Sequence, residues 1–63
     1  MREHNYLYII TNPSSEHCGE AFFVYANSKS EADLTAYSIY GEVAHFAGLY
    51  FDDEADDMGF DTY

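Results

Sequence analysis

The sequence predicts a small α+β domain, in which an antiparallel sheet carries one helix on one of its faces. Two segments rich in β-branched and aromatic residues, 6–11 and 21–26, stand on either side of a turn signal. A helix-capping pattern follows at Ser28, and a third aromatic segment, 43–51, comes after the predicted helix. The chain has 63 residues, which is enough for one domain only, spanning residues 1–63.

The first two segments are predicted to form a β-hairpin. Residues 6–11 (YLYIIT) end at the strong turn signal Asn12-Pro13, and residues 21–26 (AFFVYA) begin after the loop that ends at Gly19. The loop of about seven residues is longer than the tightest hairpin turns. One helix covers only one face of a sheet, so one set of hairpin side chains is left over. That set either packs on the third segment or forms an exposed interaction surface.

A helix is predicted over residues 29–40. Ser28 and Glu31 have the spacing of a capping box, and Glu31 and Asp33 place negative charge in the first turn, where the helix dipole favours it. Gly41 fits the position just past the helix end. One apolar face follows at helical spacing, made of Ala32, Ala36, Ile39 and Tyr40.

The last third of the chain is less strongly specified. Residues 43–51 fit either a third strand or a short second helix, and their length and aromatic content favour a strand, at least over 49–51. From Asp52 the chain becomes acidic, and no Lys or Arg occurs in the segment 52–63. This segment is interpreted either as a solvated, flexible tail or as a charged binding surface.

Charge is the most unusual property of the composition. Twelve acids face two bases, Arg2 and Lys29, for a formal charge of −10. Nucleic acid and anionic membranes are bound through Lys and Arg, so neither is an expected partner. A basic protein is attracted instead. Solubility alone needs a net charge of only about 2–8, which favours a binding role over the alternative that the charge serves solubility.

The chain is expected to be cytoplasmic. It has no apolar run long enough to span a membrane, and the start at residues 1–4 lacks the pattern of a signal peptide. Cys18 is the only cysteine, and a free thiol suits a reducing compartment.

Neither a metal site nor an active site is predicted. Asp52, Glu54 and Asp56 match the first EF-hand positions, but Asp57 stands where glycine is needed and Tyr63 where glutamate is needed. Adjacent His17 and Cys18 lack zinc-ligand spacing and rarely form a nucleophile–base pair, and no phosphate-binding loop is present. We therefore expect no cofactor and no enzyme activity.

The candidate binding residues follow from the acidity. In an extended segment the rise of about 3.4 Å per residue is close to the spacing of nucleotides along a DNA strand, so carboxylates there would stand in for phosphates. Acids of the helix would extend this surface, and two tyrosines would supply apolar anchors. The predicted partner-binding residues are Glu31, Asp33, Tyr37, Tyr50, Asp52, Asp53, Glu54, Asp56 and Asp57.

The chain resembles phage-encoded inhibitors of bacterial defence, namely anti-CRISPR proteins and other DNA mimics. The shared properties are small size, acidity and a high aromatic content without a catalytic motif. Thr11-Asn12-Pro13 after an apolar strand, followed by Phe22-Phe23-Val24-Tyr25, is similar to a small type I anti-CRISPR over residues 6–41. The resemblance implies inhibition in the host cytoplasm by occupying the DNA-binding channel of a Cas complex. It carries over no individual residue, and a restriction enzyme, repressor, glycosylase or nucleoid protein fits the composition as a target equally well.

The sequence thus predicts an acidic inhibitor that binds a basic nucleic-acid-binding protein by mimicking DNA charge. The first alternative is a small structural or adaptor module, which could form a homodimer through the left-over aromatic face and in which acidity serves only solubility. A second alternative is an acidic metal-binding domain.

Overall fold

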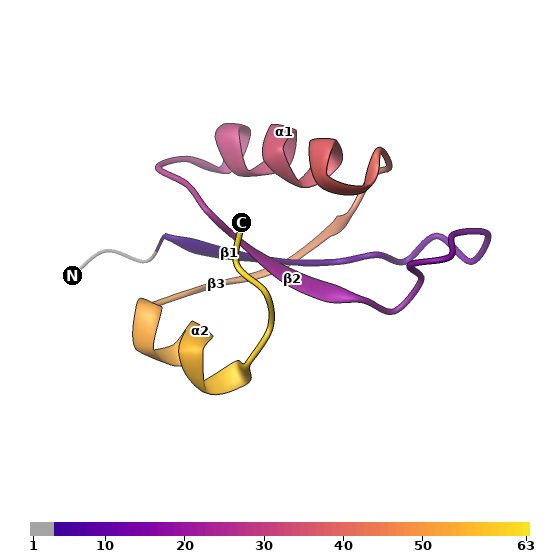
Figure 1. The fold of residues 1–63 in the computed structure, drawn as a ribbon. Coiled ribbons are helices and arrows are strands. Elements are labelled where there is room, and N and C mark those ends of the chain that lie inside the picture. The colour runs from indigo at the N-terminus through magenta and orange to yellow at the C-terminus, as the bar shows by residue number, and fades with distance from the viewer. Residues whose placement is uncertain (1–3) are drawn as a thin grey trace.

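The computed structural model describes residues 4–63 and confirms the α+β class; residues 1–3, part of the start considered for a signal peptide, lie outside the described residues. The elements follow the order β1 (Asn5–Ile9), β2 (Ala21–Tyr25), α1 (Lys29–Tyr40), β3 (His45–Tyr50) and α2 (Asp52–Met58). Figure 1 shows α1 on one face of the sheet and α2 on the other. The second helix is a correction to the predicted architecture, which had one.

The sheet has the strand order β2-β1-β3, with both pairings antiparallel. The predicted hairpin is present, with Leu7 opposite Phe23, and the third segment is a strand over 45–50. The β1–β3 register shifts by one residue between Leu7 and Tyr8, which leaves Ala47 without a partner in the register. Such a bulge bends and twists the strand that carries it.

Helix α1 has the predicted bounds, 29–40. The Ser28 hydroxyl accepts the Glu31 N–H at 3.3 Å, and Gly41, at φ 70°, donates its N–H to the Tyr37 carbonyl at 2.8 Å. Asp33 lies beyond the first turn, contrary to expectation, and pairs with Lys29 instead. The predicted apolar face packs against the sheet, where the buried cluster comprises Tyr6, Tyr8, Ile10, Phe22, Val24, Ala32 and Ala36.

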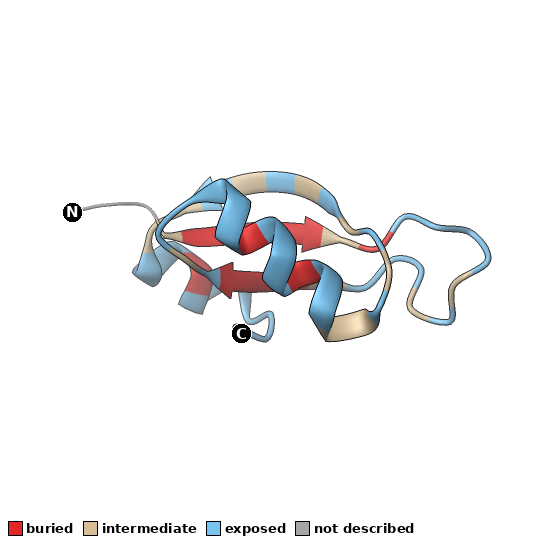
Figure 2. Cartoon of the chain, turned by 90° about the horizontal axis from the view of Figure 1, so that it is seen from above, coloured by how far each residue is buried: buried red, intermediate tan, exposed pale blue. Residues whose placement is uncertain are grey.

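Figure 2 views the molecule from the side of α1, which lies over the buried strands β1 and β2. Strand β3 runs beside α1, and its residues alternate between exposed and half-buried. One edge of the sheet is therefore less covered than its centre.

The second face of the hairpin is covered by α2. Leu7, Phe23 and Ala55 form a second buried cluster, and the Tyr50 ring of β3 packs on Phe23 with ring centroids 5.8 Å apart. The left-over side chains therefore pack on the third segment, as one of the two expectations had it, and also on a helix that was not predicted. Phe23 is 0% exposed, so this face is not the free aromatic surface on which the homodimer alternative depended.

The C-terminal residues cover the outer edge of β2 as a short parallel addition to the sheet. Phe23 and Tyr25 donate their backbone N–H groups to the carbonyls of Asp61 and Tyr63 at 2.7 and 2.9 Å, and Tyr63 donates back to Phe23 at 2.9 Å. Within residues 4–63, β3 therefore forms the sheet edge that no other segment covers.

Candidate functional site

The acidic segment begins as a helix, so the proposed match between an extended chain and the phosphates of a DNA strand is wrong. Phe51 stands at the N-cap, and its backbone N–H donates to Glu54 Oε1 at 3.2 Å. Asp52, Asp53 and Glu54 lie in the first turn, where the helix dipole favours negative charge. Gly59, at φ 74°, ends the helix. The helix dipole therefore accounts for the acids of the first turn, but not for Asp56 and Asp57 in the last turn.

Two of the five α2 carboxylates have structural roles. Asp52 Oδ1 accepts a hydrogen bond of 2.6 Å from the amide of Asn5, which is buried at the start of β1. Glu54 accepts the Phe51 N–H and so closes the first turn. Substitution of either residue would perturb the fold as well as the surface.

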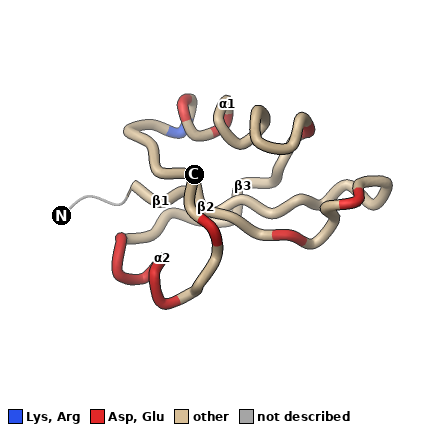
Figure 3. Tube along the Cα trace, viewed as in Figure 1, with Lys and Arg blue, Asp and Glu red and all other residues tan. Residues whose placement is uncertain are grey.

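The other three α2 carboxylates, Asp53, Asp56 and Asp57, form what we call the α2 acidic face. All three are exposed, and they make no side-chain hydrogen bond or ion pair with any residue of the described part of the chain. Their i, i+3, i+4 spacing places them on one side of the helix. Figure 3 shows the acidic residues along α2, on the side of the sheet away from Lys29.

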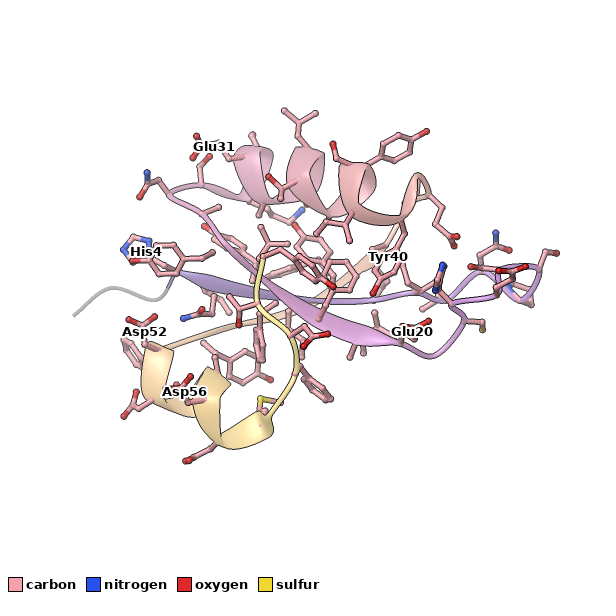
Figure 4. The ribbon with its side chains drawn as sticks, in the orientation of Figure 1. His4, Glu20, Glu31, Tyr40, Asp52 and Asp56 are labelled. Carbon is pink, nitrogen blue, oxygen red and sulfur yellow. The ribbon has the colours of Figure 1, made fainter. Side chains whose placement is uncertain are left out.

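The remaining predicted site residues do not join this face. Figure 4 shows Glu31 on α1, across the sheet from Asp52 and Asp56. Asp33 and Tyr37 also belong to α1, and Tyr50 is half-buried against Phe23. The prediction that acids of the first helix extend the surface of the acidic segment is therefore wrong, because the sheet separates the two helices.

Two apolar residues close to the α2 acidic face in the chain were missed. Met58 and Phe60 flank Gly59 and are each 41% exposed. The Phe60 ring rests on Phe23, with centroids 5.9 Å apart, which fixes its position. A large apolar residue that is half exposed and close in the chain to free carboxylates is better suited to contact with a protein than to keeping the chain soluble.

A hollow of about 430 Å³ lies between α1 and β3 and is lined by Tyr8, Thr11, Lys29, Asp33, Tyr37, Val43, Ala44, His45 and Phe46. The Tyr8 hydroxyl donates a short hydrogen bond to Asp33. Lys29 Nζ lies 3.1 Å from Asp33 Oδ2 and 5.2 Å from the centre of the Phe46 ring. The i, i+4 spacing of Lys29 and Asp33 was visible in the sequence, but the approach of Tyr8 depends on how α1 crosses β1.

Two polar residues of this hollow, Tyr8 and Lys29, pair with a third, Asp33. The hydrogen bond from Tyr8, with a further contribution from Lys29, holds the pKa of Asp33 below its usual value. Burial, and secondly the bond to Asp33, raises the pKa of the Tyr8 hydroxyl. At neutral pH the hollow therefore contains an ionised Asp33, which accepts a hydrogen bond from Tyr8 and forms an ion pair with Lys29.

Tyr8→Phe is expected to raise the pKa of the Asp33 carboxyl towards the ordinary value of 3.8. Folding lowers this pKa, so the stability it contributes is complete above the unfolded-state value and is lost as the pH falls through the folded-state value. An NMR titration of the Asp33 carboxyl carbon measures the shift. Tyr37→Phe is the matched control, since Tyr37 lines the same hollow without a bond to Asp33. An unchanged Asp33 titration in Tyr8→Phe would contradict the assignment.

The described residues were also compared with the requirements of a metal site, a membrane span and the His17–Cys18 pair. In the part of the chain described, 4–63, no three His, Cys, Asp or Glu side chains are grouped to hold a metal ion. None of the helices within these residues has the length and apolar character to cross a membrane. His17 Nδ1 contacts Glu20 Oε2 at 2.6 Å and its ring packs on Tyr40, while Cys18 is exposed.

Comparison of the chain with protein-family models, curated proteins and solved structures gives no match.

Proposed function

We propose that this protein is a non-catalytic inhibitor that binds a basic, nucleic-acid-binding protein of bacterial defence, in the manner of an anti-CRISPR. The α2 acidic face, Asp53, Asp56 and Asp57, occupies Lys and Arg side chains that otherwise hold phosphates. The helix replaces the extended segment as the scaffold of these carboxylates.

The placement of Asp56 and Asp57 is the observation that carries this proposal. Both lie in the last turn of a seven-residue helix that has no basic residue there, where the helix dipole disfavours negative charge. Asp53 and Asp57 are also like charges at i, i+4, which destabilises a helix. Charges that weaken their own helix and pair with no described residue are best explained by a partner outside the chain.

Charge and apolar contact have separate tasks in this proposal. With a formal charge of −10, the chain attracts a basic surface over a range of about 8–10 Å at ordinary salt, which accelerates association. The apolar contacts come from Met58 and Phe60, at the C-terminal end of α2, in place of the Tyr37 and Tyr50 expected from sequence. Such desolvated contacts usually determine how long a complex persists.

A pull-down from bacterial lysate with the tagged protein tests the proposal. Parallel washes contain buffer, competing double-stranded DNA, or raised salt. We expect a basic nucleic-acid-binding protein to be retained and to be displaced by DNA and by salt. If the retained partner survives DNA competition, or if none is retained, the adaptor alternative replaces charge mimicry.

A further inference from the structure

Strand β3 has the properties of an edge that can accept another strand. It is the outer strand of the order β2-β1-β3, whereas the opposite edge is covered by residues 61–63. Its sequence, HFAGLY, contains no Asp, Glu, Lys, Arg or Pro, the residues that proteins commonly use to block pairing at an edge. The bulge at Ala47 is the one such device present.

The hollow between α1 and β3 lies on the same side of the molecule as this edge. Val43 and Phe46 form its wall on the β3 side, and Tyr37 forms part of its wall on α1. Val43 is apolar but 74% exposed, so its side chain is accessible to a partner. Because Tyr8 and Lys29 already pair with Asp33, an apolar side chain that enters the hollow leaves the Asp33 carboxylate with its partners.

Carboxylates stand at both ends of β3. Before it, Glu42 accepts the Ser15 hydroxyl through Oε2 at 2.7 Å, while Oε1 is buried and has no hydrogen-bond partner among the described residues. After it, Asp53 belongs to the α2 acidic face. The six residues of β3 span about 20 Å at the rise of a strand. An added strand therefore meets an uncharged centre and negative charge at either end.

We propose that β3 binds an extended segment of a basic protein by strand addition, with a large apolar side chain in the α1–β3 hollow and Lys or Arg towards both ends. Main-chain hydrogen bonds supply affinity in this mode of recognition, and the hollow supplies specificity. The inference deepens the proposed function, on which its choice of a basic partner rests. Charge selects this occupant over a second copy of the chain, because two chains of −10 repel each other.

Two synthetic nine-residue peptides test this inference on the intact protein. The first, acetyl-KRVTFTVKR-amide, has high strand propensity, a central Phe and basic ends. The second, acetyl-KRVPFPVKR-amide, carries the same charge but cannot join a ladder, because proline lacks the N–H donor. We expect the proline peptide to bind about tenfold more weakly, and the first peptide to shift the backbone amide signals of residues 45–50.

Val43→Asp and Leu34→Asp form a matched pair of variants. Val43 lines the hollow, whereas Leu34 lies on α1 outside it, and the two are 74% and 72% exposed. Each substitution adds one negative charge at a surface position. We expect Val43→Asp to weaken binding of the first peptide by about tenfold, the effect of one buried Val contact, and Leu34→Asp to leave it within about twofold.

Three outcomes would overturn the inference. One is equal binding of the two peptides with signal shifts confined to α2, which would leave the proposed function standing as an effect of charge alone. Another is an equal effect of Val43→Asp and Leu34→Asp. The third is failure of both peptides to bind; since the lysate experiment decides the proposed function independently, the two failures are distinguishable.

Discussion

Phe23→Ala is expected to destabilise the protein by about 3–5 kcal/mol, the usual result of truncating a fully buried Phe to Ala. Phe23 is 0% exposed and joins three parts of the fold, since its ring contacts Tyr50 of β3, Phe60 after α2 and the cluster that contains Ala55. A chain of this length has a total stability of about 3–9 kcal/mol. The substitution therefore removes a large fraction of it.

Urea unfolding followed by circular dichroism measures this loss. Tyr25→Ala is the control, because Tyr25 lies on the same strand but is 56% exposed. We expect this control to cost less than about 1 kcal/mol, as surface substitutions usually do. Similar losses for the two variants would show that α2 and the C-terminal segment do not pack on the hairpin as described.

The prediction from sequence succeeded where local chemistry and apolar pattern agree. The hairpin follows from two aromatic segments around Asn12-Pro13, and α1 follows from the Ser28 cap, the apolar face and Gly41. Each signal is local, so neither depends on knowledge of the rest of the fold. These elements were predicted within one or two residues of their observed bounds.

Helix α2 was missed because its signals are weak and depend on tertiary contacts. Aspartate is a poor helix former, and four of the seven residues are Asp. Ala55 is the one buried residue of α2, so the sequence has no apolar residues repeating at helical spacing there. Its stability comes from the packing of Ala55 on Leu7 and Phe23, and from the bond between the Phe51 N–H and Glu54.

The candidate site was predicted in composition but not in arrangement. The sequence identified the acids of 52–57, yet their division into structural and free carboxylates depends on Asn5, which is 47 residues away from Asp52. The separation of Glu31 from α2 depends on which faces of the sheet the two helices cover. The α1–β3 hollow likewise depends on the strand order β2-β1-β3, which places β3 beyond the cover of α1.

The double substitution Asp56→Asn and Asp57→Asn is expected to have opposite effects on binding and on stability. Affinity for the retained partner falls by about tenfold or more at low salt, since close charge pairs across interfaces are worth about 1.5 kcal/mol or more. Thermal stability rises by about 0.3–1 kcal/mol per site, because both carboxylates oppose the helix dipole. Loss of binding through unfolding cannot produce this combination.

Glu16→Gln with Glu31→Gln is the matched control. Both residues are exposed, neither carboxylate bonds to a described residue, and the pair changes the formal charge by the same two units. Calorimetric titration at two salt concentrations gives the affinities, and thermal unfolding gives the stabilities. If the α2 acidic face makes the contact, only the α2 variant loses affinity and salt sensitivity. Equal losses in both variants would mean that net charge alone attracts the partner, and that the position of the carboxylates on α2 has no part in recognition.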